Sequence, residues 1–215
     1  MNDLIENPST RCACMLVLDT SGSMSGEPIN ELNQGLKDFL QAIKEDEVAM
    51  YSVDLGIVST GSGAPRTELN FTGCSGIEVI QPLSANGGTP LGGAVHLALS
   101  ALEQRKTEYK NKGVTYYQPW MVIISDGSPT DSWQEAAQRS HALTDSRKLV
   151  VLPVGVQGAD LAILGQFSNK GAKALQGLKF REFFEWLSAS MSRVSASNST
   201  AASVSLPSAD PWACV

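Results

Sequence analysis

Residues 12–19 read CACMLVLD, and residues 20–24 continue with TSGSM. The first stretch is a short apolar run that ends at a carboxylate, which is typical of a strand buried inside a sheet. The second stretch is polar and contains Gly22, so it predicts a tight turn directly after the strand. A buried strand followed by a turn and a helix is the repeating unit of a parallel α/β sheet.

The rest of the chain repeats this alternation of apolar runs and amphipathic stretches. Further strands are predicted at 47–58, 120–125 (WMVIIS), 149–155 (LVVLPVG) and 172–178, with a short edge strand at 67–71. Apolar residues at helical spacing predict helices at 29–43, 89–109, 131–144, 159–167 and 180–194. The expected fold is α/β: a Rossmann-like, doubly wound and mostly parallel sheet with one short antiparallel edge strand and helices on both faces.

Composition narrows the classes of function. A chain of 215 residues with 42% hydrophobic and 18% charged residues can bury one good-sized core. The net charge is −6 and no basic cluster stands out, so nucleic acid is not the expected partner. The first residues include Asp3 and Glu6 and resemble no secretion signal, and no apolar run approaches the ~20 residues that span a bilayer. We expect a cytoplasmic protein without membrane contact.

The four cysteines are Cys12, Cys14, Cys74 and Cys214. Cys12 and Cys14 are two residues apart on a predicted strand, so they point to the same face of the sheet. Their spacing lacks the paired pattern of a zinc site. We expect small buried residues and reduced thiols.

Polar residues gather where three predicted elements meet one edge of the sheet. In a doubly wound sheet, ligands bind beyond the carboxyl ends of the strands. Asp19, Ser21 and Ser23 follow the first strand, Thr89 lies in a Gly-rich loop before a helix, and Asp126 follows the WMVIIS strand. Together these residues offer three hydroxyl groups and two carboxylates.

This donor set suits a hard cation, because oxygen ligands select Mg²⁺, Mn²⁺ or Ca²⁺ over softer metals. Hydroxyl groups are neutral, so a metal that they hold keeps much of its positive charge. The two aspartates can act through water or through hydrogen bonds to the hydroxyls. Such a metal is expected to accept a carboxylate from outside the chain.

The five residues Asp19, Ser21, Ser23, Thr89 and Asp126 resemble the metal-ion-dependent adhesion site (MIDAS) of von Willebrand factor A domains. The resemblance covers residues 11–194, leaving an N-terminal arm at 1–10 and a flexible Ser/Ala-rich tail at 195–215. The stretches LDTSGSMSGEPINELNQGL, GGTPLGGA and SDGSPTDSW are similar to the bacterial TerY-like subgroup linked to tellurium resistance.

The resemblance implies a non-catalytic protein-binding module that holds Mg²⁺ and accepts an Asp or Glu of its partner. For the subgroup it implies a phosphatase of the metal-dependent 2C class and a Ser/Thr kinase as partners in a bacterial stress response. Rim residues that would set partner specificity are Met24, Glu27, Pro90 and Asp131. The Ser-rich tail is either a passive tether or a phosphoacceptor segment.

Several alternatives stay open. Thr89 also fits the N-cap of the following helix, with Pro90 as its first residue, and Asp131 with Gln134 resembles a capping box. The module could instead serve an AAA-type ATPase or chelatase as a regulatory subunit. A Mg²⁺-dependent phosphohydrolase is less favoured, because it would need a second Asp where Ser21 stands. Residues 20–24 do not form the nucleophile elbow of a Ser hydrolase.

Overall fold

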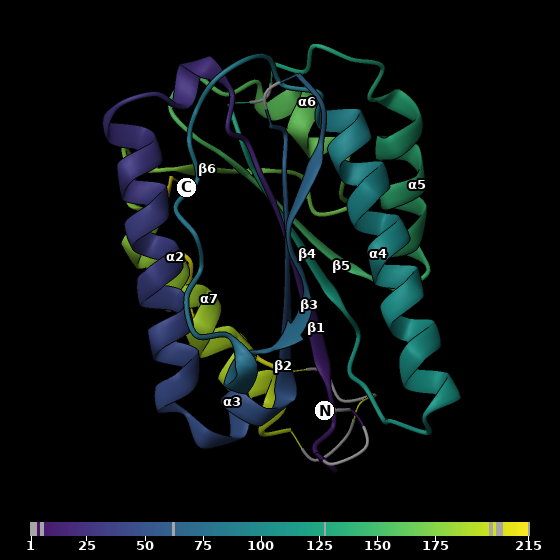
Figure 1. Ribbon diagram of the computed structural model, residues 1–215. Helices are drawn as coiled ribbons and strands as arrows, with labels where there is room; N and C mark the ends of the chain where they lie inside the picture. The colour runs from purple at the N-terminus through teal and green to yellow at the C-terminus, as the bar shows by residue number, and fades with distance from the viewer. Residues whose placement is uncertain are drawn as a thin grey trace.

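A seven-stranded sheet forms the middle layer of the molecule in the computed structural model (Figure 1). The structure describes residues 4, 7–61, 63–126, 128–197, 200 and 204–214. The strand order is β3-β2-β1-β4-β5-β6-β7, with parallel pairing from β2 to β6 and antiparallel pairing at both edges. The strands are β1 (Cys12–Leu18), β2 (Val53–Ser59), β3 (Arg66–Gly73), β4 (Trp120–Ser125), β5 (Val150–Gly155), β6 (Lys173–Leu175) and β7 (Ala213–Cys214).

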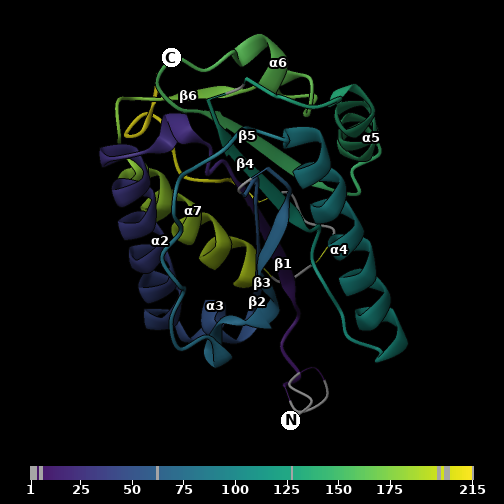
Figure 2. The same cartoon turned by 45° about the horizontal axis from the view of Figure 1, so that its top comes forward.

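Helices cover both faces of this sheet. Figures 1 and 2 show α2 and α7 on one face and α4 and α5 on the other. The helices are η1 (Gly22–Met24), α2 (Glu27–Glu45), α3 (Glu47–Ser52), η2 (Cys74–Gly76), α4 (Leu91–Asn111), α5 (Gln134–Asp145), α6 (Leu161–Gly165) and α7 (Phe180–Ser195). No helix in the described part of the chain combines the length and the apolar character needed to cross a membrane. The predicted doubly wound α/β fold, with β3 as its antiparallel edge strand, is confirmed.

The central strand β1 explains why its sequence is almost uninterrupted in apolar residues. Cys12, Cys14 and Leu16 belong to the core that packs against α2 and α7. Ala13 and Met15 alternate with them and belong to the core beneath α4 and α5. A strand covered on both faces needs apolar side chains at every position, and residues 12–18 have this pattern.

The region 47–58 differs from the single long strand expected from sequence. Residues Glu47–Ser52 form helix α3, and β2 begins only at Val53. The Asp46 carboxylate accepts hydrogen bonds from the backbone N–H groups of Val48 (3.0 Å) and Ala49 (3.1 Å). This N-cap starts a short helix whose packing against α7 outweighs the strand-like composition of the segment.

The C-terminal segment also differs from the flexible tail expected at 195–215. Residues 213–214 form β7, a second antiparallel edge strand that pairs with β6. Trp212 is completely buried, with its ring centroid 4.9 Å from that of Phe183 and 5.3 Å from that of Trp186. The average composition of residues 195–215 is polar, so it does not reveal the effect of this one large aromatic side chain. Burial of Trp212 offsets the conformational entropy that is lost when the chain around it becomes ordered.

Candidate metal centre

The predicted site lies at the carboxyl ends of β1 and β4, near η1 at the top of Figure 1. These two parallel strands are neighbours, with Leu18 opposite Ile124, and the Asp19 N–H donates to the Ile124 carbonyl at 2.8 Å. Asp19 and Asp126 each follow directly after one of the strands. The parallel register therefore brings together two carboxylates that are more than a hundred residues apart in the chain.

Asp19 is fully buried, and all its hydrogen-bond donors are neutral. Its Oδ1 accepts from the Ser21 N–H at 2.9 Å and from the Thr60 hydroxyl at 3.4 Å, and its Oδ2 accepts from the Ser125 hydroxyl at 2.6 Å. Among the described residues no Lys, Arg or His side chain forms an ion pair with Asp19. A buried carboxylate without a charged partner is costly, and a cation beside it would remove that cost.

The hydroxyls of the first turn connect the two carboxylates. The Oγ atoms of Ser21 and Ser23 lie 2.9 Å apart, and the Ser23 hydroxyl donates to Asp126 Oδ2. Asp126 Oδ1 accepts from the Ser128 N–H at 3.2 Å. Four of the five predicted residues, Asp19, Ser21, Ser23 and Asp126, therefore belong to one hydrogen-bonded group.

Thr89 lies on the loop beside this group and is 3% exposed. The loop is held by hydrogen bonds from the Asn86 N–H to the Thr20 carbonyl (2.8 Å) and from the Gly22 N–H to the Gly87 carbonyl (3.0 Å). The Thr89 backbone bonds Thr130, and its hydroxyl has no hydrogen bond with the other four predicted side chains. The structure thus places the Thr89 loop against the site but does not link the Thr89 hydroxyl to the group.

The expected caps near this loop were wrong in detail. Helix α4 begins at Leu91 with Pro90 as its N-cap, one residue later than the prediction that made Thr89 the cap. Asp131 does not cap the helix that follows it, because α5 has Trp133 as its N-cap. The Asp131 carboxylate instead accepts from the N–H groups of Gly92 (3.0 Å) and Gly93 (2.8 Å) in the first turn of α4.

Gly92 makes this contact between the loop after β4 and helix α4 possible. A Cβ atom on Gly92 would lie 2.6 Å from the Ser132 carbonyl oxygen, closer than a side chain tolerates. The second pair of glycines in GGTPLGGA, Gly92 and Gly93, thus permits the close backbone approach that glycines allow. The result is that the loop after β4 directly fixes the start of the helix that follows Thr89.

The predicted rim residues fall into two groups. Met24 is 1% exposed and packs in the core with α2, so its assignment to a partner-contacting rim was wrong. Its helix, η1, turns Met24 inward while it leaves Ser23 exposed. Glu27 is exposed, and Pro90 and Asp131 are half-buried, so these three remain at the surface around the site.

The donor chemistry restricts which ion the group could hold. The described residues contain no group of three or more His, Cys, Asp or Glu side chains suited to a metal. Hydroxyl and carboxylate oxygens are the available donors, and these fit hard cations.

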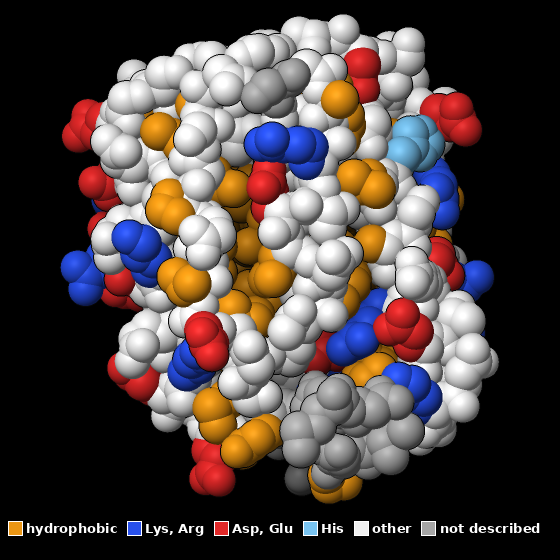
Figure 3. Space-filling model, in the orientation of Figure 1, with side chains coloured by type: hydrophobic (Ala, Val, Ile, Leu, Met, Phe, Trp, Pro, Cys, Tyr) orange, Lys and Arg blue, Asp and Glu red, His pale blue; other side chains and the backbone are white. Residues whose placement is uncertain are grey.

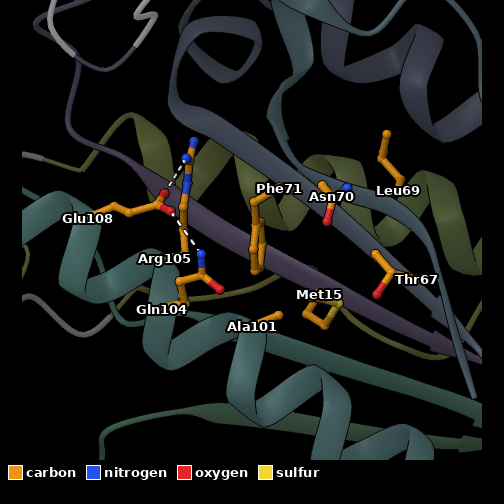
Figure 4. Close-up of a pocket in the computed structure, with 9 residues that line it drawn as sticks. All are labelled: Met15, Thr67, Leu69, Asn70, Phe71, Ala101, Gln104, Arg105 and Glu108. Carbon is orange, nitrogen blue, oxygen red and sulfur yellow. Dashed lines mark hydrogen bonds and ion pairs between the residues drawn. The ribbon is translucent and has the colours of Figure 1, made fainter.

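A separate pocket of about 240 Å³ lies between β3 and α4 (Figure 4). Its walls include Met15, Phe71 and Ala101 (Figure 4). Figure 3 shows further apolar side chains in a hollow of the same face, between β3 and the segment that precedes α4. Three of its polar side chains bond one another: the Glu108 carboxylate accepts from Arg105 at 2.9 Å and from Gln104 at 3.4 Å (Figure 4). These three side chains at the α4 wall of the pocket are thus held by one another.

The fold and this group define a doubly wound α/β domain with an oxygen-rich group at the carboxyl ends of its central strands. A model of the von Willebrand factor type A domain matches residues 14–185. The chain belongs to this family, whose domains are typically protein-interaction modules. No curated protein matches the sequence.

Solved structures share the fold at low sequence identity. The pilus adhesin SpaC from Lactobacillus rhamnosus GG, in its open conformation, superposes with a TM-score of 0.70 at 13% identity, over 86% of this chain and 30% of that one. The ArnB paralog VWA2 from Sulfolobus acidocaldarius gives 0.56 at 16% identity, over 84% and 45%. The vWF domain of the type V pili tip protein Mfa5 from Porphyromonas gingivalis gives 0.60 at 10% identity, over 84% and 94%. The chain thus spans less than a third of the adhesin, and these likenesses concern the fold alone.

Proposed function

We propose that this domain is a metal-dependent protein-binding module. Ser21, Ser23 and Thr89 would hold Mg²⁺, or Mn²⁺ or Ca²⁺ in its place, with Asp19 and Asp126 supporting the site through water or hydrogen bonds. The observation that carries the proposal is the buried Asp19 carboxylate, whose donors are all neutral, in one group with Asp126 and two serine hydroxyls. A bound cation would balance this concentration of negative charge.

The spacing of the donors supports this assignment. Neighbouring ligands of an octahedral ion at about 2.1 Å lie about 3.0 Å from each other. The Oγ atoms of Ser21 and Ser23 are 2.9 Å apart, a separation that suits two neighbouring ligands of one ion. Thr89 would complete the hydroxyl set by turning its side chain, because its loop is already held against the first turn.

The partner is expected to supply an acidic residue. Neutral hydroxyl ligands leave the ion with excess positive charge, which a carboxylate from another chain can neutralise. Ser23 is exposed, so the site is open to a partner from its side of the surface. Glu27, Pro90 and Asp131 would contact the partner around that point and set specificity.

The finer identity of the partner rests on the resemblance to TerY-like domains. On that basis we infer a phosphatase of the metal-dependent 2C class and a Ser/Thr kinase, in a bacterial stress or tellurium-resistance system of the cytoplasm. The support is the similarity of the three quoted stretches around the site. The same resemblance makes the domain a scaffold or regulator without catalytic activity of its own.

The metal assignment is tested with Asp19→Asn. This change preserves the shape of the side chain and removes its charge, so the affinity for Mg²⁺ or Mn²⁺ should fall at least about 10-fold, as is typical for a lost supporting carboxylate. Isothermal titration calorimetry measures the affinity. The matched control is Ser25→Ala on the same turn, whose hydroxyl bonds only the Ala85 carbonyl and lies outside the group. Equal affinities for Asp19→Asn and the unchanged protein would contradict the proposal.

The binding role is tested by recovering partners from a bacterial lysate with and without EDTA. Proteins that depend on the site should be lost with EDTA and with Ser23→Ala, but retained with Ser25→Ala. Recovery of a phosphatase or a kinase supports the finer proposal, whereas recovery of an AAA-type ATPase would replace it. A partner that binds equally with and without metal would end the metal-bridge mechanism.

A further inference from the structure

A second pocket, of about 330 Å³, lies at the end of the sheet opposite the metal centre. Four basic side chains line it: Lys106, Lys110, Arg147 and Lys148. The half-buried Tyr116 and the buried Pro119 add an apolar wall. Among the described residues that line the pocket there is no Asp or Glu. The chain as a whole has a net charge of −6, so this pocket differs in sign from the protein around it.

The pocket is built by the fold from two separate parts of the chain. Lys106 and Lys110 are four residues apart, so they share one side of the last turns of α4. Arg147 and Lys148 follow the end of α5. Helices α4 and α5 lie side by side on the same face of the sheet (Figures 1 and 2), and the residues after α5 line the pocket together with the last turns of α4.

Most of this charge has no partner within the described chain. Lys106 pairs with Glu103 at 2.7 Å. Lys110, Arg147 and Lys148 have no carboxylate within ion-pair distance among the described residues. Three of the four cations are therefore available to a ligand.

Helix dipoles account for only part of this arrangement. Two helices end near the pocket, and each carries roughly half a negative charge at its C-terminus. Together they balance about one of the three available cations, which leaves an excess of about two positive charges. Lys110, Arg147 and Lys148 are exposed, so an anion from solution can reach this excess charge.

The backbone of Arg147 is a second and independent observation. Its φ of 53° makes it the one non-glycine residue with positive φ in the described part of the chain. The Lys148 N–H bonds the Leu143 carbonyl at 2.9 Å, which is the hydrogen-bond pattern of a helix end where glycine is favoured. An arginine in this position carries a backbone cost that glycine would not, and residues with such a cost are enriched at ligand-binding sites.

We propose that this pocket binds a small anion with linked phosphates, a diphosphate or a nucleoside polyphosphate. The planar guanidinium group of Arg147 can bind one phosphate through two hydrogen bonds. The ammonium groups of Lys110 and Lys148 can interact with the neighbouring phosphate as flexible positive charges. The half-buried Tyr116 side chain lines the pocket, and the ring of a nucleoside could pack against it. The pocket lies at the other end of the sheet from the metal centre, so this site does not depend on the proposed function above.

The test is isothermal titration calorimetry on the full chain with pyrophosphate, ATP, AMP and inorganic phosphate, in EDTA and at low salt. Pyrophosphate and ATP should bind, and inorganic phosphate should bind at least about 10-fold more weakly, because it cannot reach both groups of cations. Tighter binding of ATP than of pyrophosphate would assign a nucleotide, and equal binding would assign a simple diphosphate. Binding should weaken steeply as salt is added.

Substitutions distinguish binding in this pocket from a general attraction of anions to the positive charges of the protein. The pair Lys110→Ala and Lys148→Ala should lower the affinity for pyrophosphate at least about 10-fold, whereas Lys37→Ala on the exposed side of α2 should leave it unchanged. Arg147→Gly should also lower the affinity while the melting temperature stays the same or rises, an outcome that loss of folding cannot produce. Absence of binding by the unchanged protein, or an equal loss with Lys37→Ala, would overturn the proposal.

Discussion

Asp131 shows how a single side chain fixes the geometry near the candidate metal centre. Its carboxylate binds two N–H groups in the first turn of α4, although 38 or more residues separate the partners in sequence. The first turn of a helix has N–H groups without partners inside the helix, and a carboxylate there also interacts favourably with the helix dipole. Asp131 thereby ties the loop after β4 to the helix that follows Thr89.

We predict that Asp131→Ala lowers the free energy of unfolding by about 1 kcal/mol, and by no more than about 2 kcal/mol. Ser132→Ala, at the next and exposed position, should change it by less than about 0.5 kcal/mol. Urea unfolding followed by circular dichroism measures both. Equal effects for the two variants would show that the cap contributes nothing.

The three described cysteine thiols form another feature at the residue scale. Cys12, Cys14 and Cys74 are free and buried, as expected from the sequence for the first two. Burial, and secondarily the Asp54 carboxylate, raises the pKa of Cys12 to about 12 and that of Cys74 to about 12. Burial also raises the pKa of Cys14, with smaller contributions from Cys12 and Cys74. These thiols stay protonated in the folded protein when thiols of the unfolded chain, with pKa values near 8.5, have ionised.

The sign of the pH dependence follows from this difference. Below about pH 8.5 both states are protonated, so the stabilisation is fully present. At higher pH the unfolded chain loses protons that the folded chain keeps, so the free energy of unfolding falls by about 1.4 kcal/mol per pH unit for each thiol. We predict that Cys12→Ala makes this decline between pH 9 and pH 10 less steep by about 1 kcal/mol per unit. Ser25→Ala should keep the original slope, and an unchanged slope in Cys12→Ala would contradict the assignment.

At the scale of the secondary-structure elements, Asp54 joins β2 to the start of β1 and to α4. Its Oδ1 accepts from Arg11 at 3.2 Å, and its Oδ2 accepts from Arg105 at 2.7 Å and from the Tyr109 hydroxyl. Asp54 and Arg11 are completely buried, and Arg105 is 8% exposed. The ionic group depends on all its members, because a buried guanidinium without its carboxylate is strongly unfavourable.

Asp54→Asn should therefore lower the free energy of unfolding by about 3–5 kcal/mol, since it leaves two arginines facing a neutral amide. Glu108→Gln is the matched control, because Glu108 pairs with the same Arg105 but its side chain is 38% exposed. That change should cost less than about 1 kcal/mol. Chemical denaturation measures both, and a loss below 1 kcal/mol in Asp54→Asn would show that the network is not a stabilising unit.

At the scale of the whole molecule, the C-terminal segment closes the sheet and covers α7. Strand β7 pairs with β6, and the Trp186 indole N–H donates to the Pro207 carbonyl at 2.9 Å. Trp212 fills the space between Phe183 and Trp186. Its own indole N–H is buried without a hydrogen-bond partner among the described residues. The contribution of Trp212 is therefore apolar packing.

We predict that Trp212→Ala lowers the free energy of unfolding by about 3–5 kcal/mol, the usual range for a large buried aromatic residue. Trp212→Phe should cost clearly less, because it keeps part of the ring contact and removes the unpaired N–H. Differential scanning calorimetry measures the melting temperatures of the two variants, and that of Trp212→Phe should be the higher. A melting temperature of Trp212→Ala equal to that of the unchanged protein would mean that the segment is not part of the folded core.

Much of the fold could be predicted, because strands buried on two faces and helices with one apolar face leave strong local patterns. The runs at 12–18 and 120–125 became β1 and β4, whose parallel pairing sets the site. The first turn and Asp126 could also be anticipated, since strand ends in such a sheet share one edge. Met24 was misplaced because only the turn of η1 decides that its side chain points inward.

The sequence by itself determined the order of the elements, the central strands and the residues that meet at their carboxyl ends, because these depend on local periodicity and on the geometry of parallel sheets. Tertiary structure alone decided that Asp131 caps α4, that Trp212 orders the C-terminal segment, and that four cations from two helix ends share one pocket. Each of these features joins residues that are far apart in the chain. Their energies arise only when the folded backbone brings them together, so no local pattern records them.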